Sequence, residues 1–408
     1  MKKIIILASS IAAILVVTIT ILVVMFVDFG KPSRNATSKY DDGLVQSVGN
    51  FTASTAGSLL KKEENTCYSP ASLYVALCLS AELMNESASK EVLTSLNYED
   101  LNDMENRYDE LIDRMVSVDS VKNIVNIANS VWVQEDIMKS DTEGYINERT
   151  KRIPMEIFCK NYDVKEVNDW ISDKTNGLID NALQQAEEFL VINTTYFKGK
   201  WGEPFSLIGE EDFKLSSGDI VQAEYMKATY EDNYVSGKDY VAVEQRYLGN
   251  SKMIFVLPDK NKELKDLTNA ETINEIIASF SNDNVSDMAE ITLKVPKFET
   301  KSDIEDKCLK ESLDKVGIKE MFNVGSWSDM VDTSNLADIC INQKTRISVD
   351  EEGTEAAAVT IVSGSPWGVE EEEKVIKLDI TLDKPFMYII MYDDVPLFIG
   401  TVYNPTEG

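Results

Sequence analysis

The chain has 408 residues, of which 43% are hydrophobic and 9% are aromatic, and this composition is sufficient for a large folded core. Its formal net charge of -30 would repel nucleic acid and anionic lipid surfaces and attract cationic proteins, so no nucleic-acid partner is expected. The absence of histidine excludes serine–histidine and cysteine–histidine catalysis and removes the commonest zinc ligand.

The N-terminal end of the chain carries a long apolar segment. After Lys2 and Lys3, the run 4–27 holds 24 residues without a charge, and about 20 such residues cross a bilayer as a helix. The segment ends in VVMFVDFG, with bulky residues where a signal peptidase needs small ones. Residues 1–30 are therefore predicted to be a membrane anchor or, alternatively, a signal sequence, which places the body on the extracellular face, secreted or anchored. Residues 31–39 form a polar linker.

Residues 40–408 are predicted to form a single domain, because they contain no tandem repeat and no long low-complexity tract. The first half is mostly helical in pattern. The segment SPASLYVALCLSAEL (69–83) begins with a serine cap and a proline in the first turn. The segment VKEVNDWISDKTNGLIDNAL (164–183) also spaces its apolar residues as successive helical turns do.

The second half of the chain is dominated by strand patterns. Runs rich in β-branched and aromatic residues, bounded by turn residues, lie at 126–134, 188–201, 252–258, 290–298, 374–382 and 386–405. The last run is almost continuously apolar, which is typical of strands covered on both faces. Helices gathered early and strands gathered late predict an α+β fold with extensive sheets.

The cysteines do not suggest a disulfide framework or a metal site. They are odd in number, scattered through apolar stretches, and without C-x-x-C spacing, at positions Cys67, Cys78, Cys159, Cys308 and Cys340. Such a set predicts buried thiols. We therefore expect no metal and no cofactor.

The segment SVDEEGTEAAAVTIVSG (348–364) combines the composition of a loop with the periodicity of a strand. Its acids and its glycine are typical of a solvated loop. Small residues at every second position from Thr354 to Val362 fit a strand with one buried face. Taken alone, the segment is more simply an ordinary acidic loop.

Several segments together resemble the serpin family of serine protease inhibitors. VDEEGTEAAAVT (349–360) resembles the reactive-loop hinge of the family, and VINTTYFKGKWGEPF (191–205) resembles its breach segment. NTCYSPASL, NDWISDKTNGLI, RYLGNSKMIFVLPD, VPKF and DKPFMYIIMYDDVPLFIGTVYNP are similar to further serpin signatures, in the order of the family. The resemblance covers about residues 40–405. It implies three β-sheets, eight or nine helices and an exposed reactive loop, here at about residues 351–375. The apolar N-terminal segment fits a bacterial member of the family.

The resemblance implies a suicide-substrate inhibitor rather than an enzyme. The target serine protease cuts the loop and forms an acyl-enzyme, and the freed loop inserts as a new strand of the main sheet and traps the protease. The hinge would consist of Glu352, Gly353, Thr354, Glu355, Ala356, Ala357, Ala358, Val359 and Thr360. Its small side chains ease insertion, and Gly353 is expected to supply a torsion that a residue with a Cβ resists. Alternation would turn Thr354 and Ala356 toward the core.

The position of the reactive bond follows from the usual length of the family's loop. Counting from the hinge gives Trp367–Gly368, and an aromatic residue before the bond suits a chymotrypsin-like protease. Cleavage at Ser365, Val369 or Val362 stays open and would suit elastase-like enzymes. The stretch that follows the bond is longer than in many serpins, so counting residues locates the reactive bond less precisely. Glu370–Glu373 are either a solvated charge run or a contact for a basic site on a cationic protease.

Two other motifs match structural sites of the family. Ser69, Ser72 and Asn193 match the shutter, a buried hydrogen-bonded cluster beneath the strands that separate, and Gln343 stands where a histidine is usual. A glutamine amide both donates and accepts hydrogen bonds, so the cluster can be kept while its pH sensitivity is lost. Trp201 matches the breach tryptophan beneath the entering hinge, with an ordinary core tryptophan as the alternative.

Two other functions compete with protease inhibition. Ser58 with Lys61, and Ser87 with Lys90, fit the S-x-x-K pattern of serine–lysine enzymes, although the KTG partner motif is missing. A serpin that binds or carries a ligand without inhibiting a protease is the other alternative. As an inhibitor, the body is expected to be monomeric, to bind a cationic serine protease, and to meet a membrane only through its N-terminal segment.

Overall fold

A computed structural model describes residues 42–60, 63–116, 123–281, 287–304, 306–336, 339, 343–354 and 376–407. The predicted anchor or signal sequence and the linker lie outside these ranges. Within these ranges, no helix is both long and apolar enough to cross a membrane.

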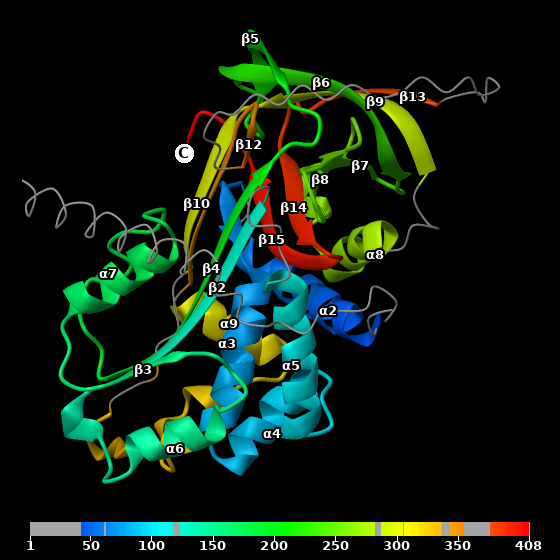
Figure 1. Ribbon diagram of the computed structural model, residues 1–408. Coiled ribbons are helices and arrows are strands. Elements are labelled where there is room, and N and C mark those ends of the chain that lie inside the picture. The colour runs from blue at the N-terminus through cyan, green and yellow to red at the C-terminus, as the bar shows by residue number, and fades with distance from the viewer. Residues whose placement is uncertain are drawn as a thin grey trace, which may run out of the picture. The chain divides into compact units, whose positions relative to one another are not determined.

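The described part of the body contains eight α-helices. They are α2 (Asp42–Leu59), α3 (Pro70–Leu83), α4 (Glu86–Ser95), α5 (Leu101–Val116), α6 (Thr142–Arg149), α7 (Val164–Lys174), α8 (Ala270–Ser281) and α9 (Asp306–Lys315). Short 3-10 turns lie at η1 (Glu135–Ile137), η2 (Leu264–Asp266), η3 (Glu320–Phe322), η4 (Val324–Trp327) and η5 (Thr333–Asn335). In Figure 1, α4 and α6 lie at one end of the body, away from β5 and β6 at the other.

The two helices that the sequence predicts are present, but one of them is shorter than its apolar spacing predicts. The Oγ atom of Ser69 accepts the N–H of Ser72 and caps α3 at the predicted serine and proline. By contrast, α7 ends at Lys174 rather than near residue 183. Asn176 and Gly177 follow with φ angles of 53° and 78°, and this left-handed backbone ends the helix.

The smaller sheet has six strands in the order β10-β11-β12-β4-β2-β3. They are β10 (Phe298–Ile304), β11 (Gln343–Val349), β12 (Gly353–Thr354), β4 (Phe189–Lys200), β2 (Asn123–Val133) and β3 (Glu156–Cys159). β4 and β2 pair antiparallel over their whole length, from Gly199 opposite Asn123 to Phe189 opposite Val133. These long strands confirm the strand predictions at 126–134 and 188–201.

The larger sheet follows the order β1-β15-β14-β8-β7-β6-β9-β13, with β5 paired to β6. Its strands are β1 (Thr66–Tyr68), β5 (Ser206–Lys214), β6 (Ile220–Ser236), β7 (Tyr240–Arg246), β8 (Ser251–Pro258), β9 (Asp287–Pro296), β13 (Lys377–Thr381), β14 (Phe386–Tyr392) and β15 (Val395–Val402). β6 belongs to both halves of this sheet. Its residues 225–234 pair with β9 in one half, and its residues 234–236 pair with β7 in the other. The two halves and the smaller sheet together form the three predicted sheets.

The core is built around α3 and the last two strands. α3 packs against β4 of the smaller sheet and β15 of the larger one, and nearly all its residues are buried. Every residue of β14 and β15 is buried. This burial confirms the prediction that the apolar C-terminal strands are covered on both faces.

The smaller sheet is covered on both faces by helices. On β4, Leu190 and Ile192 pack with α7, whereas Phe189 and Val191 belong to the main core that contains α3. Successive side chains of a strand point to opposite faces. α7 and α3 therefore cover opposite faces of this sheet.

The described cysteines are free thiols, and two of the four are buried, as the sequence predicts for all of them. Cys67 and Cys78 are buried, and Cys159 and Cys308 are half-buried. Burial raises the pKa of the Cys67 thiol to about 11, despite hydrogen bonds from its neighbours that act in the opposite direction. Such a thiol stays protonated and unreactive at neutral pH. Cys340 lies outside the described residues.

Glu82 is a buried carboxyl group on α3. The residue is 3% exposed, and its Oε1 atom has no hydrogen-bond partner within the described part of the chain. Burial, reinforced by the negative charge of Glu105, raises the pKa of Glu82 from 4.5 to about 7, although Arg149 and Arg152 act in the opposite direction. Glu82 can therefore titrate near neutral pH in a chain that has no histidine.

Glu82→Gln is expected to stabilise the protein above pH 7. The folded state keeps a proton on Glu82 up to about pH 7, whereas the unfolded chain releases it near pH 4.5, so the free energy of unfolding falls as the pH rises through this window. The buried carboxylate costs about 3 kcal/mol once it is ionised, and a neutral amide avoids that cost. Denaturant unfolding at pH 5 and pH 8 would measure the difference.

Glu148→Gln is the control for this experiment, because the Glu148 side chain is 72% exposed. It should leave the pH dependence of unfolding unchanged. A Glu82→Gln variant with the same pH dependence as the wild type would show that the buried carboxyl does not destabilise the folded state.

Candidate functional site

The predicted hinge enters the smaller sheet as the short strand β12. Thr354 pairs with Val349 of β11 on one side and with Gly199 of β4 on the other, and Gly353 pairs with Lys200. The hinge residues Glu355, Ala356, Ala357, Ala358, Val359 and Thr360 and the predicted reactive bond Trp367–Gly368 lie outside the described residues. The described start of the hinge is therefore already a strand between β11 and β4 (Figure 1).

Gly353 is required by close packing rather than by its torsion angles. It is not among the glycines with positive φ, so the expected special torsion is absent. Instead, a Cβ at this position would lie 2.0 Å from the carbonyl oxygen of Gly199. Real Cβ atoms do not approach backbone so closely. A side chain at position 353 would therefore push β12 away from β4.

Gly353→Ala is expected to lower the melting temperature of the native state. Inserting a methyl group against a backbone carbonyl forces the strands apart, and such overpacking costs about 1–3 kcal/mol. Thermal unfolding would measure the loss. Glu352→Ala is the control, since it shortens the neighbouring side chain without adding an atom. An unchanged melting temperature in Gly353→Ala would contradict the close contact.

Thr354 faces the core, on the side that the alternation predicts. It is 1% exposed, and its Oγ1 atom lies 2.6 Å from the hydroxyl of Tyr247. The Tyr247 ring stacks on Trp201, with ring centroids 4.2 Å apart and an interplanar angle of 11°. The hinge therefore packs against an aromatic pair at the end of the sheet.

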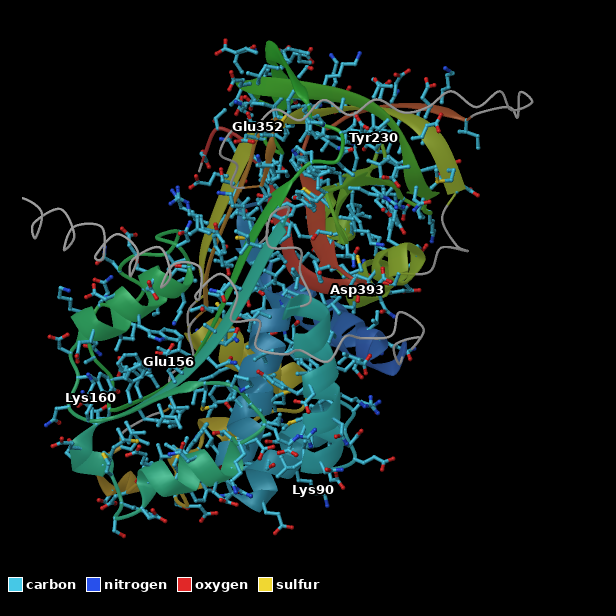
Figure 2. All side chains as sticks on the ribbon, viewed as in Figure 1. Lys90, Glu156, Lys160, Tyr230, Glu352 and Asp393 are labelled. Atoms are coloured by element: carbon cyan, nitrogen blue, oxygen red, sulfur yellow. The ribbon has the colours of Figure 1, made fainter. Side chains whose placement is uncertain are left out.

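Trp201 holds the turn that precedes β12. Its indole Nε1 donates to the carbonyl of Asp350 at 2.9 Å, and its backbone N–H donates to the carbonyl of Glu352 at 3.0 Å. The carboxylate of Asp350 accepts the N–H groups of Glu352 and Gly353 at 2.8 and 3.1 Å. Figure 2 places Glu352 at the same end of the body as β5 and β6. Trp201 therefore bonds to the turn that leads into β12.

Asp350 was not singled out from the sequence, although a signal for it exists. Aspartate is favoured at the first position of a tight turn, and glycine is favoured at the fourth, which is the spacing of Asp350 and Gly353. Tyr247 carried no comparable signal, because it lies more than one hundred residues from Thr354, with which it bonds. Only the folded chain brings them together.

An ion pair links the turn to the larger sheet. The Nζ atom of Lys297 lies 2.7 Å from a carboxylate oxygen of Glu351 and 3.3 Å from one of Glu224 on β6. Partial burial by itself would raise the pKa of Glu351. The hydrogen bond and charge of Lys297 outweigh this effect and lower that pKa below its usual value. Because all three side chains are partly exposed, we expect a contribution of about 1 kcal/mol or less.

The predicted shutter residues form two hydrogen-bonded groups. Gln343 accepts the N–H of Ser69 and donates to its carbonyl, both at 3.0 Å. The Ser69 hydroxyl also donates to the carbonyl of Leu397 at 2.7 Å. Asn193 instead donates to Asn129 on β2 at 2.7 Å. The glutamine therefore bonds to the serine end of the cluster, while the asparagine end belongs to the β2–β4 pair.

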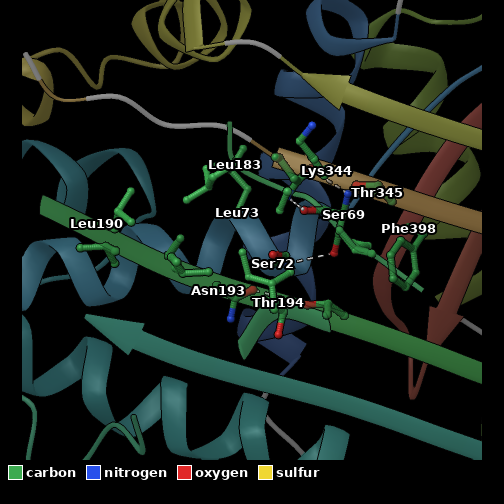
Figure 3. Close-up of a pocket in the computed structure, with 18 of the residues that line it drawn as sticks. Ser69, Ser72, Leu73, Leu183, Leu190, Asn193, Thr194, Lys344, Thr345 and Phe398 are labelled. Atoms are coloured by element: carbon green, nitrogen blue, oxygen red, sulfur yellow. Dashed lines mark hydrogen bonds between the residues drawn. The ribbon is translucent and has the colours of Figure 1, made fainter. Parts of the chain in front are cut away.

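A cavity of about 110 Å³ lies between β4 and β11, and the four predicted shutter residues line it (Figure 3). Its walls include Leu190 and Ile192, which face α7, as well as Val191, which faces the main core. The cavity therefore passes through the sheet. Beyond β12, no ladder joins β4 to β11 among the residues described.

Two side chains at this opening have unused hydrogen-bonding capacity. The hydroxyls of Thr194 on β4 and Thr345 on β11 are buried, and neither has a partner in the described ranges. A buried hydroxyl without a partner costs free energy. The arrangement suits an extended segment that would enter below β12 and pair with both strands.

Of the two competing serine–lysine motifs, only that of Ser87 and Lys90 lies wholly within the described residues. Ser87 and Lys90 are exposed on α4, and Figure 2 shows Lys90 far from the hinge. Ser58 bonds to the hydroxyl of Ser312 at 2.8 Å, and Lys61 lies outside the described residues. No group of three or more aspartate, glutamate or cysteine residues able to hold a metal ion occurs among the described positions.

The comparisons with known proteins agree on one family. A family model described as "Serpin (serine protease inhibitor)" matches residues 46–405. The chain is 26% identical to Serpin A3-1 of Bos taurus over 370 residues, which is 86% of each chain. It is also 27% identical to an uncharacterised serpin-like protein of Thermococcus kodakarensis over 398 residues, 91% of this chain and 90% of the relative.

Solved structures match the fold over nearly the whole chain. The thermophilic serpin tengpin in its native state matches with a TM-score of 0.76 at 24% identity, covering 93% of this chain and 98% of its own. Thyroxine-binding globulin in complex with thyroxine matches with a TM-score of 0.73 at 19% identity, covering 90% and 100%. Both likenesses show the fold alone.

Proposed function

The chain belongs to the serpin family, and we propose that it is a suicide-substrate inhibitor of serine proteases. The observation that supports this most directly is the opening between β4 and β11, which lies in line with β12. The start of the hinge already pairs with both strands there. The inserting segment would continue from Thr354 into this opening.

The proposed reaction begins at the bond between Trp367 and Gly368. The protease serine attacks the carbonyl carbon of Trp367, the peptide bond breaks, and the amine of Gly368 leaves with the C-terminal part. Trp367 then carries the protease as an ester. Residues 355 onward enter between β4 and β11, where each new backbone hydrogen bond contributes about 0.5–1.5 kcal/mol net.

The target protease is proposed to be cationic, because the chain carries a formal charge of -30. An aromatic residue at the cleaved bond suits a chymotrypsin-like pocket, and cleavage at Ser365, Val369 or Val362 would suit an elastase-like enzyme. In this proposal the protein acts as a monomer on the extracellular face, either secreted or anchored by residues 1–30.

The test is to mix the full-length chain with chymotrypsin or pancreatic elastase and boil the mixture in detergent. We expect a covalent complex that survives boiling and that is absent when the protease serine is chemically blocked. N-terminal sequencing of the released peptide should begin at Gly368. Cleavage without a complex would instead support the second candidate, a serpin that binds or carries a ligand without inhibiting a protease.

A further inference from the structure

A second cavity, of about 180 Å³, lies at the junction of several segments of the larger sheet. Its walls come from the end of β5, the end of β8, the segment around η2 and the start of β14, together with Tyr403 after β15. Five lysines and two glutamates line it. This excess of lysine contrasts with the whole chain, where 70 acidic residues outnumber 40 basic ones.

The lysines that line this cavity fall into two groups. Lys262 pairs with Asp239 at 3.1 Å, and Lys265 pairs with Glu263. Lys214, Lys260 and Lys384 form no ion pair with any described residue. We call these three the unpaired lysines. They come from three separate segments, so their meeting is a product of the fold.

Lys384 lines the cavity with its side chain partly buried. Its Nζ atom donates to the backbone carbonyl of Asp259 at 2.8 Å. Burial is the main cause that lowers the pKa of Lys384. The nearby carboxylates of Asp383 and Asp259 act in the opposite direction, and Lys214 adds only a smaller lowering. An anion bound between Lys214 and Lys384 would interact favourably with both ammonium groups.

We propose that the unpaired lysines bind a small multivalent oxyanion of the pyrophosphate class. A lysine ammonium carries three donors and is a common ligand of phosphate groups. Leu215, Pro258 and Pro385 also line the cavity, and their apolar surface lowers the local dielectric and strengthens the attraction. A long polyanion would be repelled by the chain's formal net charge of -30, which favours a compact ligand.

Isothermal titration calorimetry of the full-length chain with sodium pyrophosphate tests this proposal. We expect saturable binding of one ligand per chain, weakened at least tenfold in Lys384→Met and in Lys214→Met. Lys90→Met is the control, because Lys90 is exposed on α4, away from β5 and β6 in Figure 1. A wild-type chain that shows no saturable binding, or a Lys384→Met variant that binds as tightly as the wild type, would overturn the proposal.

A melting experiment separates loss of the site from loss of the fold. Pyrophosphate should raise the melting temperature of the wild type and of Lys90→Met, because a ligand that binds only the folded state stabilises it. At a pyrophosphate concentration near the wild-type dissociation constant, it should raise the melting temperature of Lys214→Met much less, although the substituted side chain is exposed and the fold is kept. A nucleoside diphosphate tested in parallel distinguishes the two sources of the diphosphate group. Tighter binding than pyrophosphate would support a nucleotide, and equal binding would support the inorganic ion.

Discussion

Cleavage of the full-length chain within its proposed reactive loop is expected to raise the melting temperature by about 10 °C or more. Insertion of about ten residues between β4 and β11 would form two new ladders, each bond contributing about 0.5–1.5 kcal/mol, for a total on the order of 10 kcal/mol. In a domain of about 370 residues, about 1 kcal/mol shifts the melting temperature by roughly 1–2 °C. The uncleaved state can store this difference because the intact loop is anchored at both ends.

Differential scanning calorimetry of the intact and the cleaved chain would measure this shift. Small side chains such as Ala356 and Ala358 would enter without forcing the sheet further apart, and the buried hydroxyls of Thr194 and Thr345 would gain neighbours with which to bond. The control is a chain whose hinge cannot insert, cleaved in the same way. Equal melting temperatures for the intact and cleaved wild type would end the proposal that the loop inserts.

Thr354→Arg is expected to abolish the covalent complex and to convert the protein into a substrate that the protease cuts and releases. Thr354 is 1% exposed and bonds to Tyr247 above the ring of Trp201. A guanidinium there would be buried without a carboxylate partner, which costs several kcal/mol. β12 would be expelled, and the segment that follows it would lose its first paired residues.

The measurement for Thr354→Arg is the fraction of protease captured as boiled complex, together with the melting temperature after cleavage. The cleaved variant should not gain the stability expected of the wild type. Thr354→Ser is the matched control, since it keeps the hydroxyl that meets Tyr247. If Thr354→Arg still captured protease as the wild type does, insertion through the hinge would not be the mechanism.

Several local features were predictable because their causes lie within one segment. The serine cap and proline at Ser69 and Pro70 predict the start of α3, and the apolar run at 386–405 predicts the buried strands β14 and β15. The period of two at Thr354 predicts that its side chain faces the core, where the structure places it. The apolar spacing predicts a longer α7 than the structure has, because it continues past the stop signal at Asn176 and Gly177.

The sequence by itself determined the family, the order of most elements and the face of the hinge, because periodicity, caps and motifs act between neighbouring residues. Only the tertiary structure decided that Gly353 is needed for its approach to Gly199 and that Asn193 bonds to Asn129 rather than to the serines. The same holds for the opening between β4 and β11 and for the meeting of the unpaired lysines. Each depends on segments far apart in the chain, whose contacts are set by the packing of the whole core.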